Sequence, residues 1–174
     1  MQKTKLILRF NKMEEARLQL YSRINAADKN LLQRKPKEGK WNTLQIIFHM
    51  NSSEEKSVAY ISKKILSGNS IPKTGLSSSL KSLLLTIALK YFKFKKPAML
   101  PDPPEDLEVK NVLEKWSETR NQLSQLIISL PEDLIDREIF KHPRAGKMNM
   151  YQALKFMDDH VNHHLKQVDQ LIGR

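Results

Sequence analysis

Apolar side chains recur along most of the chain at steps of three and four residues, the spacing of one face of an α-helix. The first run predicts a helix over residues 5–33, which Pro36 and Gly39 would end. A second helix is expected to start at Thr43, its candidate N-cap, and to stop near Gly68. The first third of the chain therefore predicts two long amphipathic helices.

The same spacing predicts two further long helices. One is expected over residues 105–130, where Pro131 stops it, and the other over 150–172, with Asn149 as a candidate cap. Between the second and third helices, residues 70–104 form a long proline-containing connection. Four long helices with one long connection predict an all-α four-helix bundle in a single domain, residues 1–174.

The long connection carries a short helical pattern of its own. Residues 80–94 combine leucines with lysines and predict a short amphipathic helix inside the crossover. The only strand-like segment is 136–141, and the pattern offers it no partner. We therefore expect a helical crossover and no sheet.

The amino-acid composition excludes several kinds of functional site. No cysteine is present, which excludes disulfides, a thiol nucleophile and cysteine-ligated metal sites. The N-terminus has only three consecutive apolar residues, Leu6 to Leu8, and no segment approaches the ~20 apolar residues of a membrane span. A cytoplasmic protein is expected, and any metal site in it must use histidine and carboxylate ligands.

The net charge of +11 is unevenly distributed. Residues 73–96 carry six lysines and no acid, whereas 97–140 carry 4 basic and 10 acidic side chains. A basic amphipathic segment at 80–96 is compatible with an anionic membrane surface or nucleic acid, or with packing over the bundle or against another subunit. No nucleic-acid motif is present, so no specific nucleic-acid partner is expected.

Histidines supply the candidate chemistry. His160 and His164 are four residues apart on the predicted last helix, so both imidazoles lie on one face, one turn apart. His49, on the second helix, is the candidate third ligand. A satisfied core pair or a surface pair remains an alternative. His163 is expected to face solvent, and His142 to be structural or exposed, with a position at the mouth of a site as the further alternative.

Two segments resemble the motifs of the DinB-like superfamily. The first is Trp41 to Met50 followed by Glu54 and Glu55, with a tryptophan at the start of the second helix and a histidine eight positions later. The second runs from His142 to Gln167. The resemblance implies a bundle of the DinB type.

The resemblance also implies that the bundle binds a metal ion through three ligands, His49, His160 and His164. Three imidazoles suit zinc or nickel, and also iron or manganese, and leave a coordination position open. The resemblance implies a metal-dependent transferase or hydrolase that activates water or a low-molecular-weight thiol, and a homodimer. A non-catalytic metal-binding or stress-response bundle is the alternative. Candidate residues behind the ligands are Glu54, Glu55 and Gln167, although solvated surface or routine packing also explains each of them.

Overall fold

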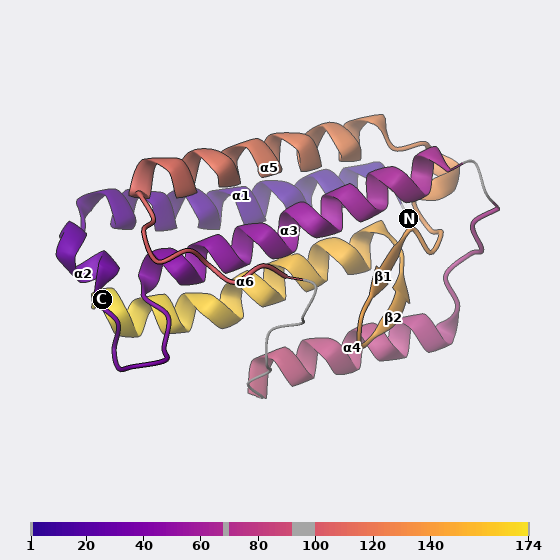
Figure 1. Cartoon of the computed structure of the whole chain (residues 1–174). Coiled ribbons are helices and arrows are strands. Elements are labelled where there is room, and N and C mark those ends of the chain that lie inside the picture. The colour runs from indigo at the N-terminus through magenta and orange to yellow at the C-terminus, as the bar shows by residue number, and fades with distance from the viewer. Residues whose placement is uncertain (1, 68–69, 92–99, 174) are drawn as a thin grey trace.

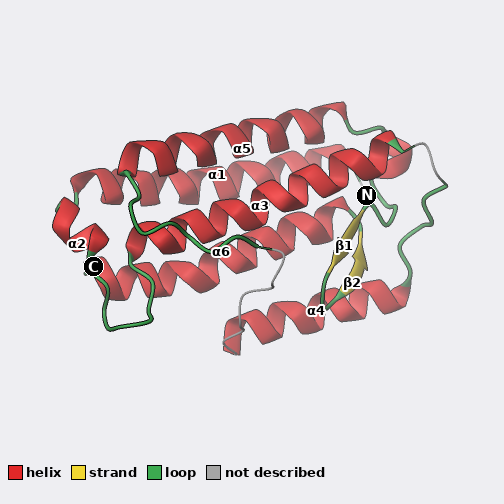
Figure 2. Ribbon diagram, in the orientation of Figure 1, coloured by secondary structure: helices red, strands yellow, loops and turns green. Residues whose placement is uncertain are grey.

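The computed structural model describes residues 2–67, 70–91 and 100–173, and helices dominate them (Figures 1 and 2). The helices are α1 (Lys3–Ala26), α2 (Lys29–Gln33), α3 (Thr43–Leu66), α4 (Leu76–Tyr91), α5 (Val109–Ser129) and α6 (Met150–Ile172). A short 3-10 helix, Glu132–Leu134, precedes two short strands, β1 (Phe140–His142) and β2 (Gly146–Met148). Over this part of the chain, no helix is both long and apolar enough to cross a membrane.

The long helices α1, α3, α5 and α6 run side by side (Figure 1). Both α1 and α3 pack against α5 and α6, and the short α2 contacts α3 and α6. Helix α4 packs along α6 and against β2, outside the group of long helices (Figure 1). The α3–α6 contact is the one that positions the candidate ligands.

The interior consists of two apolar clusters. The first includes Met13 and Leu123, and the second includes Leu20 and Trp116. On three helices a buried charged residue stands between the clusters: Met13, Arg17 and Leu20 on α1; Met50, Glu54 and Val58 on α3; Trp116, Arg120 and Leu123 on α5. A polar layer therefore crosses the middle of the packed helices.

Two helix boundaries at the N-terminal end differ from the prediction. The expected helix over 5–33 is interrupted, because Ala27 is extended (ψ 151°) and the Asp28 side chain accepts a hydrogen bond from the Asn30 amide (2.7 Å), which starts α2. The N-cap of the second helix is Asn42 and not Thr43. Asn42 and Gln45 form a reciprocal capping box, which satisfies two amide groups that Thr43 alone could not.

The remaining helix ends show one correction and one confirmation. Helix α5 begins at Val109 and not at residue 105, and Glu108 is its N-cap. Asn149 caps α6 as predicted, in a second capping box with Gln152. The short helix of the connection is confirmed, although it begins at Leu76; its predicted end at residue 94 lies outside the described residues.

The expectation that no strands pair is wrong. Phe140 pairs with Met148 and His142 with Gly146 in an antiparallel hairpin. Gly146 has a φ of 77°, in the left-handed region that favours glycine, and this allows the tight turn. The ring nitrogen Nδ1 of His142 accepts hydrogen bonds from the backbone amides of Arg144 (3.2 Å) and Ala145 (3.1 Å). His142 therefore has a structural role, which is one of the alternatives expected from the sequence.

Candidate metal centre

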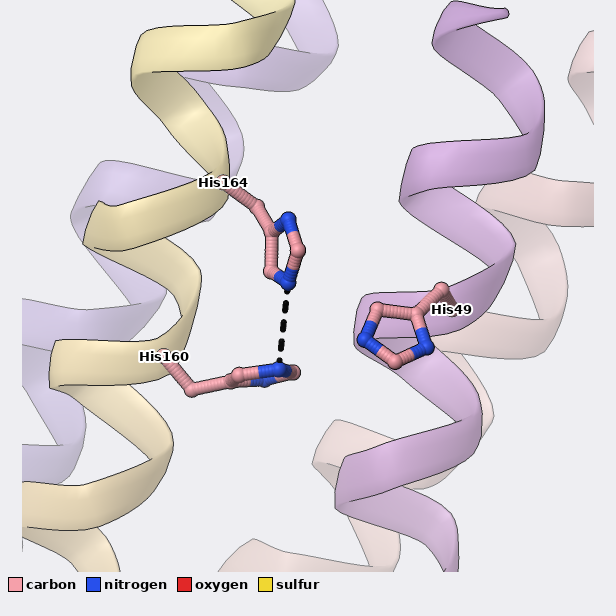
Figure 3. Close-up of side chains that lie close together, drawn as sticks. All are labelled: His49, His160 and His164. Atoms are coloured by element: carbon pink, nitrogen blue, oxygen red, sulfur yellow. Dashed lines mark hydrogen bonds between the residues drawn. The ribbon is translucent and has the colours of Figure 1, made fainter. Parts of the chain in front are cut away.

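Three buried histidines converge between α3 and α6. His49 comes from α3, and His160 and His164 come from successive turns of α6. One nitrogen from each ring lies within 4.8 Å of the others, and the Nε2 atoms of His160 and His164 are 3.2 Å apart. The residues are 5%, 9% and 9% exposed, respectively. Figure 3 shows one edge of the His49 ring turned toward the two imidazoles of α6.

Matching caps set the position of these histidines along their helices. An asparagine followed three residues later by a glutamine starts both α3 and α6, and each pair forms a complete capping box. Because Asn42 and Asn149 fix where the helices begin, they fix which turn carries His49 and which turns carry His160 and His164. The three rings meet because α3 packs directly against α6.

Aromatic rings surround the imidazoles. The Trp41 ring lies 5.0 Å from His49, and Phe156 stacks on His160 with ring centroids 5.8 Å apart and an interplanar angle of 29°. His163 is half-buried, in contrast to the expected solvent-facing position, and its ring lies edge-on to His164 at 5.0 Å. These ring contacts contribute to the burial of the three imidazoles.

The surroundings favour neutral imidazoles. Burial, reinforced by the neighbouring His164 and His49, holds the pKa of His160 well below its usual 6.5. Burial also lowers the pKa of His164 to about 3, with His49 and His163 acting in the same direction and a hydrogen bond to Gln167 opposing them. A neutral imidazole is the form that binds metal ions, and the lowered pKa values of His160 and His164 favour that form at both residues.

The donor set fits a divalent ion. Two nitrogens that bind one zinc ion at about 2.0–2.1 Å lie about 3.3 Å apart in a tetrahedral site. The Nε2 atoms of His160 and His164 are already at 3.2 Å. Borderline ions such as zinc and nickel accept imidazole readily. Among the described residues, His49, His160 and His164 form the group of histidine and acidic side chains whose ligand atoms lie close enough together to bind one metal ion.

The residues expected behind the ligands occupy three different environments. The side-chain oxygen Oε1 of Gln167 lies 3.4 Å from Nδ1 of His164, on the outer side of that ring. Glu54 is buried and faces α5, where Arg120 binds both of its carboxylate oxygens at 2.7 Å. Glu55 is about 42% exposed and lies 3.5 Å from Lys115 at the surface.

The structure adds residues that the sequence reasoning did not single out as functional. Trp116 donates its indole N–H to Glu54 (2.8 Å), beside the bidentate contact from Arg120. The position of Arg120 was a usable signal, because Arg120 lies four residues after Trp116 and three before Leu123, at the helical spacing of apolar residues in the helix predicted over 105–130. A charged residue at such an inward position predicts a buried partner. Phe156, which covers His160, gave no comparable signal.

His142 lies near this centre without joining it. Its ring is 4.5 Å from Phe156, at an angle of 64°. Burial, together with the positive charge of Arg144, lowers the pKa of His142 to about 4. The neutral ring therefore keeps its Nδ1 atom available as an acceptor for the hairpin turn.

Comparison with known proteins agrees with this geometry. The family model of the DinB superfamily matches residues 12–168, which include all three histidines of the cluster. Searches of curated proteins and of solved structures gave no significant match. Because the matched region extends over most of the sequence, the chain belongs to the DinB superfamily.

Proposed function

We propose that this chain is a metal-dependent enzyme in which His49, His160 and His164 bind one divalent ion, zinc or nickel in preference to iron or manganese. The observation that carries the proposal is the convergence of three buried imidazole rings from two helices. Three protein ligands leave at least one coordination position open, as in catalytic sites and in contrast to structural zinc sites with four protein ligands. Transferase or hydrolase chemistry on a small molecule is part of the proposal, because the resemblance to the DinB-like superfamily implies it and the open position would allow it.

When bound, the ion would lower the pKa of a coordinated water or low-molecular-weight thiol and so supply a nucleophile at neutral pH. The residues of the chain prepare the site. Gln167 orients the His164 ring through its outer nitrogen. Trp41 and Phe156 shield the imidazoles from water. Glu54, bound to Arg120, anchors the turn of α3 that follows His49.

The proposal includes the architecture typical of the superfamily. The four long helices would form one bundle and one domain, with α4 inside the crossover between α3 and α5. The packing of α1 and α3 against both α5 and α6 supports this. A cytoplasmic location is part of the same proposal, because the sequence lacks the cysteines that disulfide-bonded exported domains use.

Metal content tests the site. The protein is purified without a histidine tag or nickel column, and elemental analysis compares wild type with His160→Ala. We expect one ion per chain in wild type and a loss of at least tenfold in the variant. His163→Ala, on the same helix, is the matched control and should retain the metal. A stoichiometric ion that His160→Ala leaves unchanged would refute the proposal.

Activity assays separate the enzyme from a non-catalytic bundle. Metal-loaded wild type and His164→Ala are assayed against thiol-transfer and ester-hydrolysis panels. Turnover that depends on His164 supports the enzyme. If chelation lowers the melting temperature and no substrate of either panel turns over, the alternative of a metal that only stabilises the fold is favoured instead.

A second candidate function concerns α4. Leu80, Leu84 and Ile87 are 59%, 56% and 45% exposed and follow one another at steps of four and three residues, so they form an apolar stripe on one face of the helix. The segment 73–96 carries six lysines and no acid. An apolar stripe with only positive charge in its segment favours an anionic lipid surface as the partner.

Vesicle sedimentation tests this second candidate. Wild type is expected to bind vesicles that contain phosphatidylglycerol and not vesicles of phosphatidylcholine, and Leu84→Glu should abolish binding. Leu18→Glu, at a similarly exposed leucine (54%) of α1, is the control and should bind as wild type does. Self-association that Leu84→Glu abolishes, without lipid binding, would assign the stripe to a homodimer contact and refute the membrane role. Binding to nucleic acid alone would refute it as well.

A further inference from the structure

A small cavity lies beside the histidine cluster, between α3, the β1–β2 hairpin and α6. Its volume is about 90 Å³, and its walls include Ser53, Tyr60, Phe140 and Phe156. Most of the exposed wall is apolar. An apolar cavity with a few polar groups at its edge is the usual form of a small-molecule site.

Aromatic rings connect this cavity to the cluster. The Tyr60 ring is edge-on to Phe140 at 5.9 Å, Phe140 stacks on Phe156 at 6.0 Å, and Phe156 stacks on His160 at 5.8 Å. Phe156 is therefore a wall shared by the cavity and the candidate metal centre. Ser53 follows His49 by one turn of α3, so the two residues share a face of that helix.

The charges at the cavity are positive. Lys56 on α3 and Lys141 on β1 belong to its lining, and both residues are exposed. Neither lysine has a hydrogen-bond or ion-pair partner within the described ranges, whereas Lys155 and Lys147, nearby in the sequence, are paired with acids. No aspartate or glutamate is among the residues that line the cavity. Two unpaired ammonium groups beside an apolar wall are complementary to an anion with an apolar body.

We propose that this cavity binds a short aliphatic carboxylate, with the apolar group against Phe140 and Phe156 and the carboxylate at Lys56 and Lys141. The volume sets the size, because a cavity of ~150 Å³ holds a benzene ring and this one is smaller. A branched or short straight chain fits, and a bicyclic ring system does not. That the carboxylate is a substrate of the metal centre rests on the proposed function. That the cavity binds the carboxylate does not depend on the metal.

A matched ligand series tests the inference. The full-length protein is titrated with 3-methylbutanoate, 3-methylbutan-1-ol and 3-methylbutylamine, and binding is followed by ¹H–¹⁵N NMR spectra. We expect saturable binding of the acid, with shifts at Ser53 and Phe156, and at least tenfold weaker binding of the alcohol and the amine. The three molecules share one apolar body, so the difference isolates the charge.

A second experiment reverses the charge of the two lysines that line the cavity. Lys56→Glu combined with Lys141→Glu should weaken acid binding at least tenfold, whereas Lys12→Glu, at an exposed lysine of α1, should leave it unchanged. Equal binding of acid and alcohol, no binding of the acid, or equal effects of all the lysine variants would overturn the inference. Metal content measured on the same samples keeps the two proposals separate. Binding of the acid without any metal would overturn only the proposed function, and metal without acid binding only this inference.

Discussion

Replacing Glu54 by glutamine should destabilise the protein far more than the same change at the adjacent residue. Glu54 and Arg120 are 1% and 2% exposed and share two hydrogen bonds of 2.7 Å. Glutamine keeps the shape of the side chain but removes its charge and turns one acceptor into a donor. The guanidinium group of Arg120 would then be buried without its main counter-charge.

The magnitude follows from this burial. Breaking a buried ion pair by neutralising one partner costs about 3–5 kcal/mol. Glu14 partly compensates, since one of its carboxylate oxygens lies 3.8 Å from Nη1 of Arg120, and we therefore expect about 3 kcal/mol for Glu54→Gln. Glu55→Gln removes an exposed pair and should cost at most about 1 kcal/mol. The two adjacent substitutions thus compare a buried carboxylate bound by Arg120 and Trp116 with a carboxylate at the surface.

A double-mutant cycle in urea unfolding at pH 7 measures the coupling. Arg120→Met alone should cost about 3 kcal/mol, because it leaves the Glu54 carboxylate buried with Trp116 as its remaining close donor. The double variant Glu54→Gln/Arg120→Met buries no charge and should cost clearly less than the sum of the two single changes. If Glu54→Gln and Glu55→Gln cost the same, or if the single effects add, the polar layer does not contain a coupled ion pair.

Three further predictions follow from the helices that carry the cluster. The pKa of His164 is lowered to about 3 in the folded protein and is about 6.5 in the unfolded chain, so the unfolded chain binds more protons between these values. Metal-free protein should therefore lose about 1.4 kcal/mol of stability per pH unit through this residue as the pH falls below 6.5, and urea unfolding of His164→Gln should show a shallower slope; equal slopes would contradict this. Gln167→Ala should weaken zinc binding up to about tenfold in competition titrations with a chelator, whereas Gln170→Ala should not; equal affinities would remove Gln167 from the site. Asn149→Ala should cost about 1 kcal/mol in urea unfolding, since it removes the α6 capping box, and a loss as small as that of the exposed Asn25→Ala would rule out a capping contribution.

The long helices were predictable because apolar residues recur along each of them at helical spacing. The apolar spacing located α3 and α6 within a few residues, and Asn149 was recognisable as a cap from its position before the last apolar run. The break at Ala27 was not recognisable, because the apolar spacing continues into α2 while the backbone changes direction. A local cap at Asp28 prevailed over a periodic pattern that suggested one longer helix.

Features made by distant segments were harder to predict. The strand-like segment 136–141 has partners on two sides: Lys73 bridges to Arg137, and β1 pairs with β2. Strands of three residues are too short for alternation of polar and apolar positions to identify them. The histidine cluster was predictable because two of its members share one helix face, and the family resemblance supported His49 as the third member. The partners of Glu54, Trp116 and Arg120, lie on α5. The spacing of residues within α3 therefore could not identify them.

Anomalous diffraction shows whether the three imidazoles bind a single ion. Crystals of protein loaded with one equivalent of zinc are measured on both sides of the zinc absorption edge. The account predicts one anomalous peak about 2.0–2.1 Å from a ring nitrogen of each of His49, His160 and His164. A peak located elsewhere, or one within bonding distance of fewer than three of these rings, would contradict it.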